Sequence, residues 1–142
     1  MQIKRWIVTL SLGLVLAAGF ACHFSMSTAN IGGLKLGKDE TVSQELTTFG
    51  EHDTVYAVAT IANAPGKVKV KGRLAIEDVP GEDVGPIKGL EKTLDLGGSG
   101  TATYNFSPPE VGWPKGKYKV EVFLLTEEGE QKEQKSASFT VS

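Results

Sequence analysis

The sequence predicts an all-β protein: a β-sandwich of roughly seven to nine short antiparallel strands behind an N-terminal signal segment. Two observations carry this prediction. Beyond residue 30, apolar and polar residues alternate with a period of two in nearly every segment. Turn residues, above all Gly and Pro, separate these segments about every 8 to 12 positions. No window of about a dozen residues shows the apolar stripe of an amphipathic helix.

The clearest strand covers residues 67–76. Its apolar side chains point one way and its basic side chains the other, because successive side chains alternate across a pleated strand. Residues 54–62 are apolar on both faces, which predicts a strand in the centre of its sheet. Further strands are predicted at residues 31–36, 42–49, 90–96, 101–106, 117–125 and 136–141. On the last three, the side chains expected in the core are Ala102, Tyr104, Phe106, Tyr118, Val120, Val122, Leu124, Ala137, Phe139 and Val141.

Residues 114–120, PKGKYKV, form a turn and the start of a strand. This run resembles the D-x-G-x-Y-x-C motif of immunoglobulin-like domains, in which the tyrosine bonds the backbone at the corner between the sheets. The resemblance implies that Tyr118 is the corner tyrosine, that Gly116 is the turn glycine and that Val120 takes the core cysteine's place. Pro114 replaces the aspartate, so the acidic part of the motif is missing. The implied fold is an Ig-like β-sandwich, and no ligand is implied.

The first 22 residues have the order of a secretory signal peptide. Lys4 and Arg5 form a short basic start, 14 uncharged residues run from Ile7 to Phe20, and small residues lead to Cys22, the only cysteine. The apolar run is shorter than the roughly 20 residues that a membrane span needs. We therefore expect the protein to be exported.

Cys22 could be the attachment point of a lipid anchor. Residues 19–22, GFAC, resemble the lipobox of bacterial lipoproteins. The usual lipobox has a leucine, then a small residue, then glycine or alanine, then the cysteine, and only Ala21 and Cys22 fit it well. The resemblance implies that Cys22 is acylated and holds the protein on a membrane. Soluble secretion after cleavage at Ala21 or Ala29, or an uncleaved anchor, is the alternative. With Cys22 lipidated or removed, no thiol is left for a disulfide.

The predicted organisation is a signal peptide at 1–21, the anchor cysteine and a flexible tether at 22–30, and one domain at 31–142. A domain of about 110–120 residues suits a single core. Removing Lys4 and Arg5 from the 15 basic residues leaves 13 against 17 acidic residues, a formal net charge of −4. This balance argues against nucleic acid as a partner and against a polybasic grip on anionic lipid.

The sequence predicts no catalytic site, no metal site and no cofactor. The two histidines are His23 in the tether and His52 in a loop. A zinc site or a nucleophile–base pair needs several such groups together. The acidic pairs lack the alternating pattern of a calcium loop, and no glycine-rich phosphate motif occurs.

Two features are candidates for an interaction surface. Lys67, Lys69, Lys71 and Arg73 form a basic stripe that fits an acidic protein or polysaccharide. Alternatively, these charges keep a strand near a sheet edge from pairing with other chains. Trp113, among turn residues, is either an exposed recognition residue on the rim or a lid that seals the end of the core.

From these features we expect an exported, non-enzymatic accessory or interaction module, anchored through Cys22 at a bacterial membrane and facing the periplasm or the cell surface. Its partner is a protein or a polysaccharide. One alternative is a subunit of a surface assembly or filament, in which residues 31–36 pair with a neighbour's sheet edge. The other is an exported enzyme.

Overall fold

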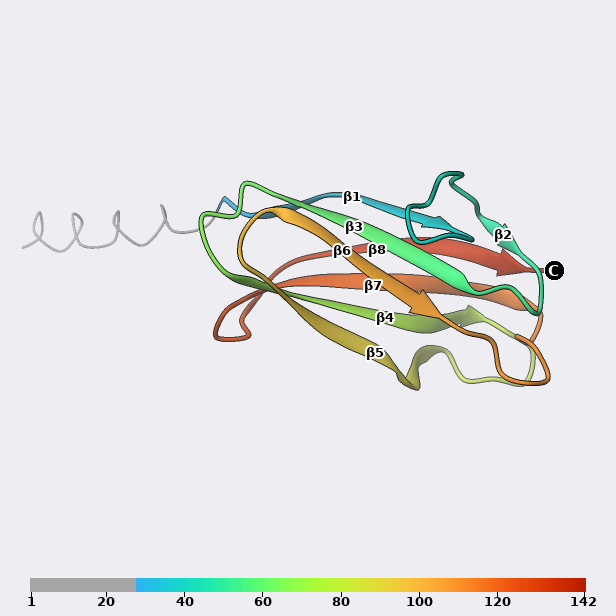
Figure 1. Cartoon of the computed structure of the whole chain (residues 1–142). Helices are drawn as coiled ribbons and strands as arrows, with labels where there is room; N and C mark the ends of the chain where they lie inside the picture. The colour runs from blue at the N-terminus through green and yellow to red at the C-terminus, as the bar shows by residue number, and fades with distance from the viewer. Residues whose placement is uncertain (1–27) are drawn as a thin grey trace, which may run out of the picture.

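The structure, a computed structural model, describes residues 28–142, and all regular structure in this range is strand (Figure 1). The predicted signal peptide, Cys22 and most of the predicted tether lie outside the described residues. The all-β prediction is confirmed, and the number of strands is within the predicted range. The eight strands are β1 (Asn30–Gly37), β2 (Thr48–Phe49), β3 (Val55–Ala62), β4 (Val68–Asp78), β5 (Gly85–Leu96), β6 (Gly100–Phe106), β7 (Gly116–Thr126) and β8 (Gln131–Val141).

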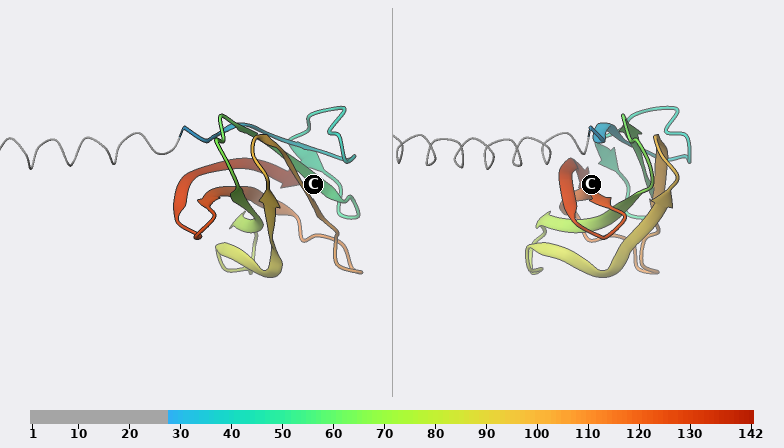
Figure 2. Two further views of the ribbon diagram at one scale, coloured as in Figure 1. Left: turned by 60° about the vertical axis from the view of Figure 1, so that its left-hand side comes forward. Right: turned by 90° about the vertical axis from the view of Figure 1, so that its left-hand side faces the viewer.

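The strands form two sheets that lie as two layers (Figure 2). One sheet has three strands in the order β1-β3-β6, and the other has five in the order β2-β8-β7-β4-β5. The pairing is antiparallel except between β2 and β8, which run parallel. β3 lies in the centre of its sheet, as its two apolar faces predict.

One apolar core fills the space between the layers, and both sheets contribute to it. The inward side chains predicted for 101–106 and 117–125 are buried, and so are Phe139 and Val141, while Ala137 is partly buried. The prediction of which face of these strands is buried is therefore confirmed. The three-stranded sheet adds Val55, Ala57, Ala59 and Ile61, and β4 adds Val68, Val70 and Leu74.

Tyr104 on β6 reaches across the core to β4 in the other sheet. Its hydroxyl donates a hydrogen bond of 2.6 Å to the carbonyl oxygen of Val70, and its ring lies against Gly72. A Cβ atom at position 72 would stand 2.7 Å from Cε1 of the ring, so the ring needs a glycine there. Burial raises the pKa of Tyr104, which keeps the hydroxyl protonated and able to donate.

The segment 42–49 is mostly not a strand, so this prediction was wrong. Only Thr48–Phe49 pairs, as β2 beside β8. Upstream, Asp39 organises a turn: its carbonyl oxygen accepts from the Val42 amide at 3.0 Å, and its carboxylate accepts from the Ser43 amide at 2.9 Å. Such local side-chain bonds compete with strand pairing. The apolar residues of this segment pack a loop against the core.

The basic strand is not itself a sheet edge but lies next to one. β4 pairs with β5 on one side and with β7 on the other, so the edge strand is β5. β5 begins at Gly85 rather than residue 90, and β8 begins at Gln131 rather than residue 136. Both strands are longer than predicted because ladder pairing continues where the apolar alternation has stopped.

Tyr118 makes the backbone contact that the corner motif implies, and Gly116 begins the same strand. The Tyr118 ring is 1% exposed, and its hydroxyl donates to the Pro114 carbonyl oxygen at 2.5 Å. Gly116 has a φ of +149°, and a Cβ there would stand 2.5 Å from the Asp78 carbonyl oxygen. Val120 is fully buried. The assignment of the whole domain as Ig-like stays a prediction.

Substitutions at Tyr118 should separate its hydroxyl from its ring. Tyr118→Phe removes one hydrogen bond and should lower the free energy of unfolding by about 1 kcal/mol. Tyr118→Ala also removes a ring that stacks on Phe139 with centroids 5.4 Å apart, and should cost about 3 kcal/mol or more. Lys117→Ala, on the exposed face of the same strand, should stay within about 0.5 kcal/mol. Denaturant unfolding measures all three, and equal losses for Lys117→Ala and Tyr118→Ala would contradict the assigned faces.

Candidate functional site

The outer face of the five-stranded sheet, turned away from the core, carries most of the predicted basic stripe. On this face the register places Lys71 of β4 beside Phe123 of β7, and Arg73 beside Glu121. Gly72, between these two basic residues, faces the core. The structure therefore brings the stripe together with side chains of β7 that lie about 50 positions away in the sequence.

The four basic residues of the stripe divide between two hollows in this face. Lys67, which precedes β4, and Lys69 line a hollow of about 500 Å³ near the start of the strand. Lys71 and Arg73 line a second hollow of about 380 Å³. The other side chains of the second hollow are Phe123 and Leu125 of β7 and Gln131 of β8, with Gly129 in the turn between these strands.

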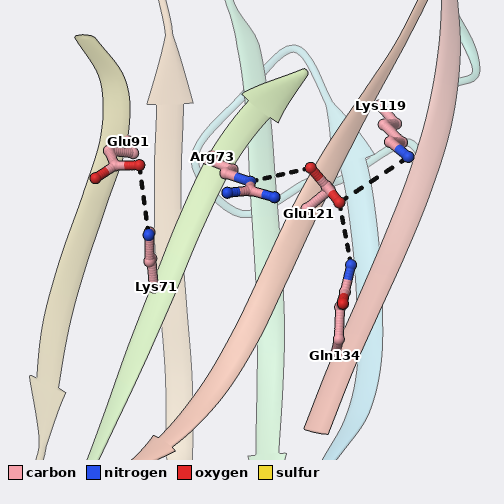
Figure 3. Close-up of polar contacts among 6 residues, drawn as sticks. All are labelled: Lys71, Arg73, Glu91, Lys119, Glu121 and Gln134. Atoms are coloured by element: carbon pink, nitrogen blue, oxygen red, sulfur yellow. Dashed lines mark hydrogen bonds and ion pairs between the residues drawn. The ribbon is translucent and has the colours of Figure 1, made fainter. Parts of the chain in front are cut away.

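Glu121 is a buried carboxylate on this outer face, and three side chains cover it (Figure 3). One carboxylate oxygen accepts from Nε of Arg73 at 3.0 Å, and the other accepts from Nε2 of Gln134 at 3.0 Å. Nζ of Lys119 lies 4.0 Å from the second oxygen. Because a buried charge is costly unless it is paired and hydrogen-bonded, Glu121 holds these side chains of β4, β7 and β8 together.

Arg73 lies over the ring of Phe123. The guanidinium carbon is 4.7 Å from the ring centroid, and Nζ of Lys71 is 5.9 Å from it. Such cation–π contacts are attractive because the ring face carries negative charge density. The two basic side chains cover Phe123 so well that it is only 7% exposed, although it points away from the core. Arg73 is thus fixed both by the ring and by Glu121.

Lys69 and Lys71 of the stripe pair with the edge strand β5. Lys69 lies 3.5 Å from Asp95, and Lys71 lies 3.5 Å from Glu91. Exposed pairs of this kind contribute little to stability, about 0–1 kcal/mol. They do reduce the positive field of the face, so the stripe is not a surface of free charge for a polyanion. The distinct feature is the guanidinium held on an aromatic ring beside a hollow.

Trp113 lies away from this face and is not exposed. It is 4% exposed, its indole Nε1 donates to the Asp53 carbonyl oxygen at 2.8 Å, and its amide donates to the Glu51 carbonyl oxygen at 2.7 Å. Its ring meets Tyr118 edge-on, with centroids 6.1 Å apart. The prediction that Trp113 is an exposed residue of an interaction surface is therefore wrong. Its position is that of a lid over one end of the core.

Several residues of this face were missed from the sequence. In residues 117–125 the prediction named only the inward side chains. It gave no role to Glu121, Phe123 and Leu125, which alternate with them on the outer face. A signal was present, since β7 carries large apolar residues on both faces toward its end. Gln134 gave no such signal, because its role depends on the pairing of β8 with β7.

Within residues 28–142, no three or more His, Cys, Asp or Glu side chains are grouped so that they could hold a metal ion. No helix in that range is long and apolar enough to cross a membrane. His52 is exposed in its loop.

Comparisons with known proteins bear on the fold and do not identify a family. No protein-family model matches the sequence, and no curated protein matches it. Among solved structures, an alkylpurine DNA glycosylase from Pseudomonas fluorescens is 17% identical with a TM-score of 0.51, over 81% of this chain and 30% of the glycosylase. A β-glucosidase of intestinal bacteria is 17% identical with a TM-score of 0.50, over 82% of this chain and 16% of the enzyme.

A third structure matches over nearly its whole length. The soluble domain of PmoD from a Methylocystis species is 18% identical with a TM-score of 0.46, over 82% of this chain and 98% of that domain. At these identities the likeness to the two enzymes shows a shared fold of the matched part alone. The parts matched in them are less than a third of each enzyme, so the fold is what the likeness transfers.

Asp53, whose carbonyl oxygen bonds Trp113, also makes carboxylate contacts whose contribution to stability should depend on pH. The Asp53 carboxylate accepts from the Gly50 amide at 2.6 Å and pairs with Lys38 at 3.1 Å. These two contacts, the Gly50 amide first, hold the pKa of Asp53 below its usual value. Its stabilising effect is therefore present above the unfolded-state pKa of about 3.9 and is lost as the pH falls through the lower pKa of the folded state.

Asp53→Asn should therefore lower the free energy of unfolding by about 1 kcal/mol near pH 7, with a difference from the parent that shrinks as the pH falls below about 3.9 and through the lower pKa of folded Asp53. Denaturant unfolding across this pH range measures it. Asp95→Asn, whose exposed carboxylate pairs with Lys69, is the matched control and should change the free energy of unfolding by less than about 0.5 kcal/mol. A difference for Asp53→Asn that stays constant with pH would rule out the assigned contacts.

Proposed function

We propose that the protein is an exported, non-enzymatic interaction module, held at a bacterial membrane by an acylated Cys22, which binds its partner through the outer face of the five-stranded sheet. The observation that carries the proposal is the guanidinium of Arg73 fixed on the ring of Phe123 beside a hollow of about 380 Å³. Cation-over-aromatic arrangements of this kind are typical of recognition surfaces, where Arg and aromatic residues are enriched.

The course of the chain supports an anchor at the N-terminal side. Thr28 bonds the Asn63 carbonyl oxygen, and Asn30 pairs with Ala62, so the chain enters the domain beside the loop between β3 and β4. The C-terminus lies at the opposite end of the strands (Figure 1). An anchor upstream of Thr28 would thus hold one end of the domain and leave the outer face of β4 and β7 accessible along its side.

A surface assembly through residues 31–36 is less favoured. β3 already pairs with one edge of β1. On the side that faces β8, the Ile31 amide donates to the Glu133 carboxylate at 2.6 Å. A strand from a second chain would have to displace this bond before it could add to β1.

The anchor is tested by Cys22→Ala. We expect the parent protein to partition into the detergent phase and its intact mass to show a chain that begins at Cys22 and carries acyl groups. Cys22→Ala should move the protein to the aqueous phase, because one or two acyl chains supply the affinity for the membrane. Cys22→Ala that stays in the detergent phase, or a parent chain that begins at Asn30, would contradict the lipoprotein part of the proposal.

A further inference from the structure

We infer that the hollow beside Arg73 receives a carboxylate side chain from an acidic, partly apolar peptide segment of a partner protein. The inference deepens the proposed function and rests on it, because it names the chemistry of the partner at the same face. It stands on three features: the state of the guanidinium, the apolar wall beside it, and the charge around it.

The guanidinium of Arg73 is fixed in place through its Nε atom, while the N–H donors of its two Nη atoms face no protein acceptor within residues 28–142. Nε is bonded to Glu121, and the planar group is held on the Phe123 ring. Within residues 28–142, no hydrogen bond or ion pair joins its Nη atoms to another residue. A carboxylate pairs with the two donors of such a fork in parallel. Because Glu121 and the ring already hold the side chain, little of its freedom would be lost on binding.

Apolar side chains border the same hollow. Leu125, which is partly exposed, lines it beside the covered ring of Phe123, and Gln131 of β8 and Gly129 of the β7–β8 turn line it as well. A ligand that places a carboxylate at Arg73 would therefore bring the atoms next to it against apolar surface. A peptide with an acidic residue beside a leucine or valine has this pattern, and burial of one such side chain adds a favourable term.

A peptide fits this face better than an acidic polysaccharide. Sugars bind aromatic residues through an open ring face, whereas Arg73 and Lys71 already cover the ring of Phe123. The peptide would lie across the face rather than extend the sheet, because β4 and β7 are each paired with strands on both sides.

The charges around the hollow suit an anion. Arg73 and Lys119 share the single carboxylate of Glu121, which leaves this part of the face with more positive than negative charge. Lys71 is paired with Glu91 at 3.5 Å. An incoming carboxylate would therefore meet the Nη donors of Arg73 rather than Lys71.

The test is an NMR titration of the mature protein with three probes. The first is a capped peptide of sequence GELELG, the second is its neutral counterpart GQLQLG, and the third is polygalacturonate. We expect GELELG to shift the Arg73 Nε–Hε signal and the amide signals of Phe123, Leu125 and Gln131. The neutral peptide should bind at least about tenfold more weakly, because the bond to a charged group is lost.

Substitutions then assign the binding to the fork of Arg73. Arg73→Gln should weaken binding of GELELG about tenfold or more, and Arg73→Lys, which keeps the charge but loses the fork, should weaken it to a lesser extent. Lys115→Gln is the matched control, since it removes the same charge from an exposed residue that pairs with Glu51 and lies outside the hollow. It should change the affinity less than twofold.

Four outcomes would overturn the inference: no shifts at millimolar GELELG, shifts centred away from the hollow, equal effects of Arg73→Gln and Lys115→Gln, or tighter binding of polygalacturonate than of the peptide. Because the titration maps the site on the parent protein, it decides the matter even if Arg73→Gln fails to fold. The outcome is also separate from that of the Cys22 experiment, which tests the anchor alone.

Discussion

The contact between Tyr104 and Gly72 sets how closely the two sheets approach, and the other features of the fold depend on it. The tyrosine spans the core from β6, packs its ring on the one position of β4 that has no side chain, and bonds the Val70 carbonyl oxygen. Apolar packing alone is non-directional. A buried hydroxyl must find a partner, so this bond selects one relative position of the sheets.

The inner contact also fixes the outer face. Gly72 points inward between Lys71 and Arg73, so the position of β4 on Tyr104 decides where both basic side chains emerge. On the outside, the buried carboxylate of Glu121 draws Arg73, Lys119 and Gln134 together from three strands. Breaking a buried pair of this kind by removing one partner typically costs about 3–5 kcal/mol. The candidate site is therefore a rigid part of the sheet rather than a flexible loop.

The sequence was sufficient for the strands and their inner faces, because the period of two in residues such as Tyr118, Val120 and Val122 is a local property. It was not sufficient for the site. Arg73 meets Glu121 only because β4 pairs with β7. The residues of these two segments do not indicate which strand each one pairs with. The loop before β2 was mistaken for a strand for a related reason. Its shape depends on hydrogen bonds to Asp39, and the pattern of apolar residues contains no information about such bonds.

A double-mutant cycle between Gly72 and Tyr104 tests the central claim most directly. Gly72→Ala should cost about 1–3 kcal/mol of unfolding free energy in the parent, because the new methyl group overlaps the ring. In a Tyr104→Leu background, where the ring is gone, the same change should cost much less, which gives a coupling energy above about 1 kcal/mol. Costs that add to within about 0.3 kcal/mol would show that the two residues do not touch and would contradict this account.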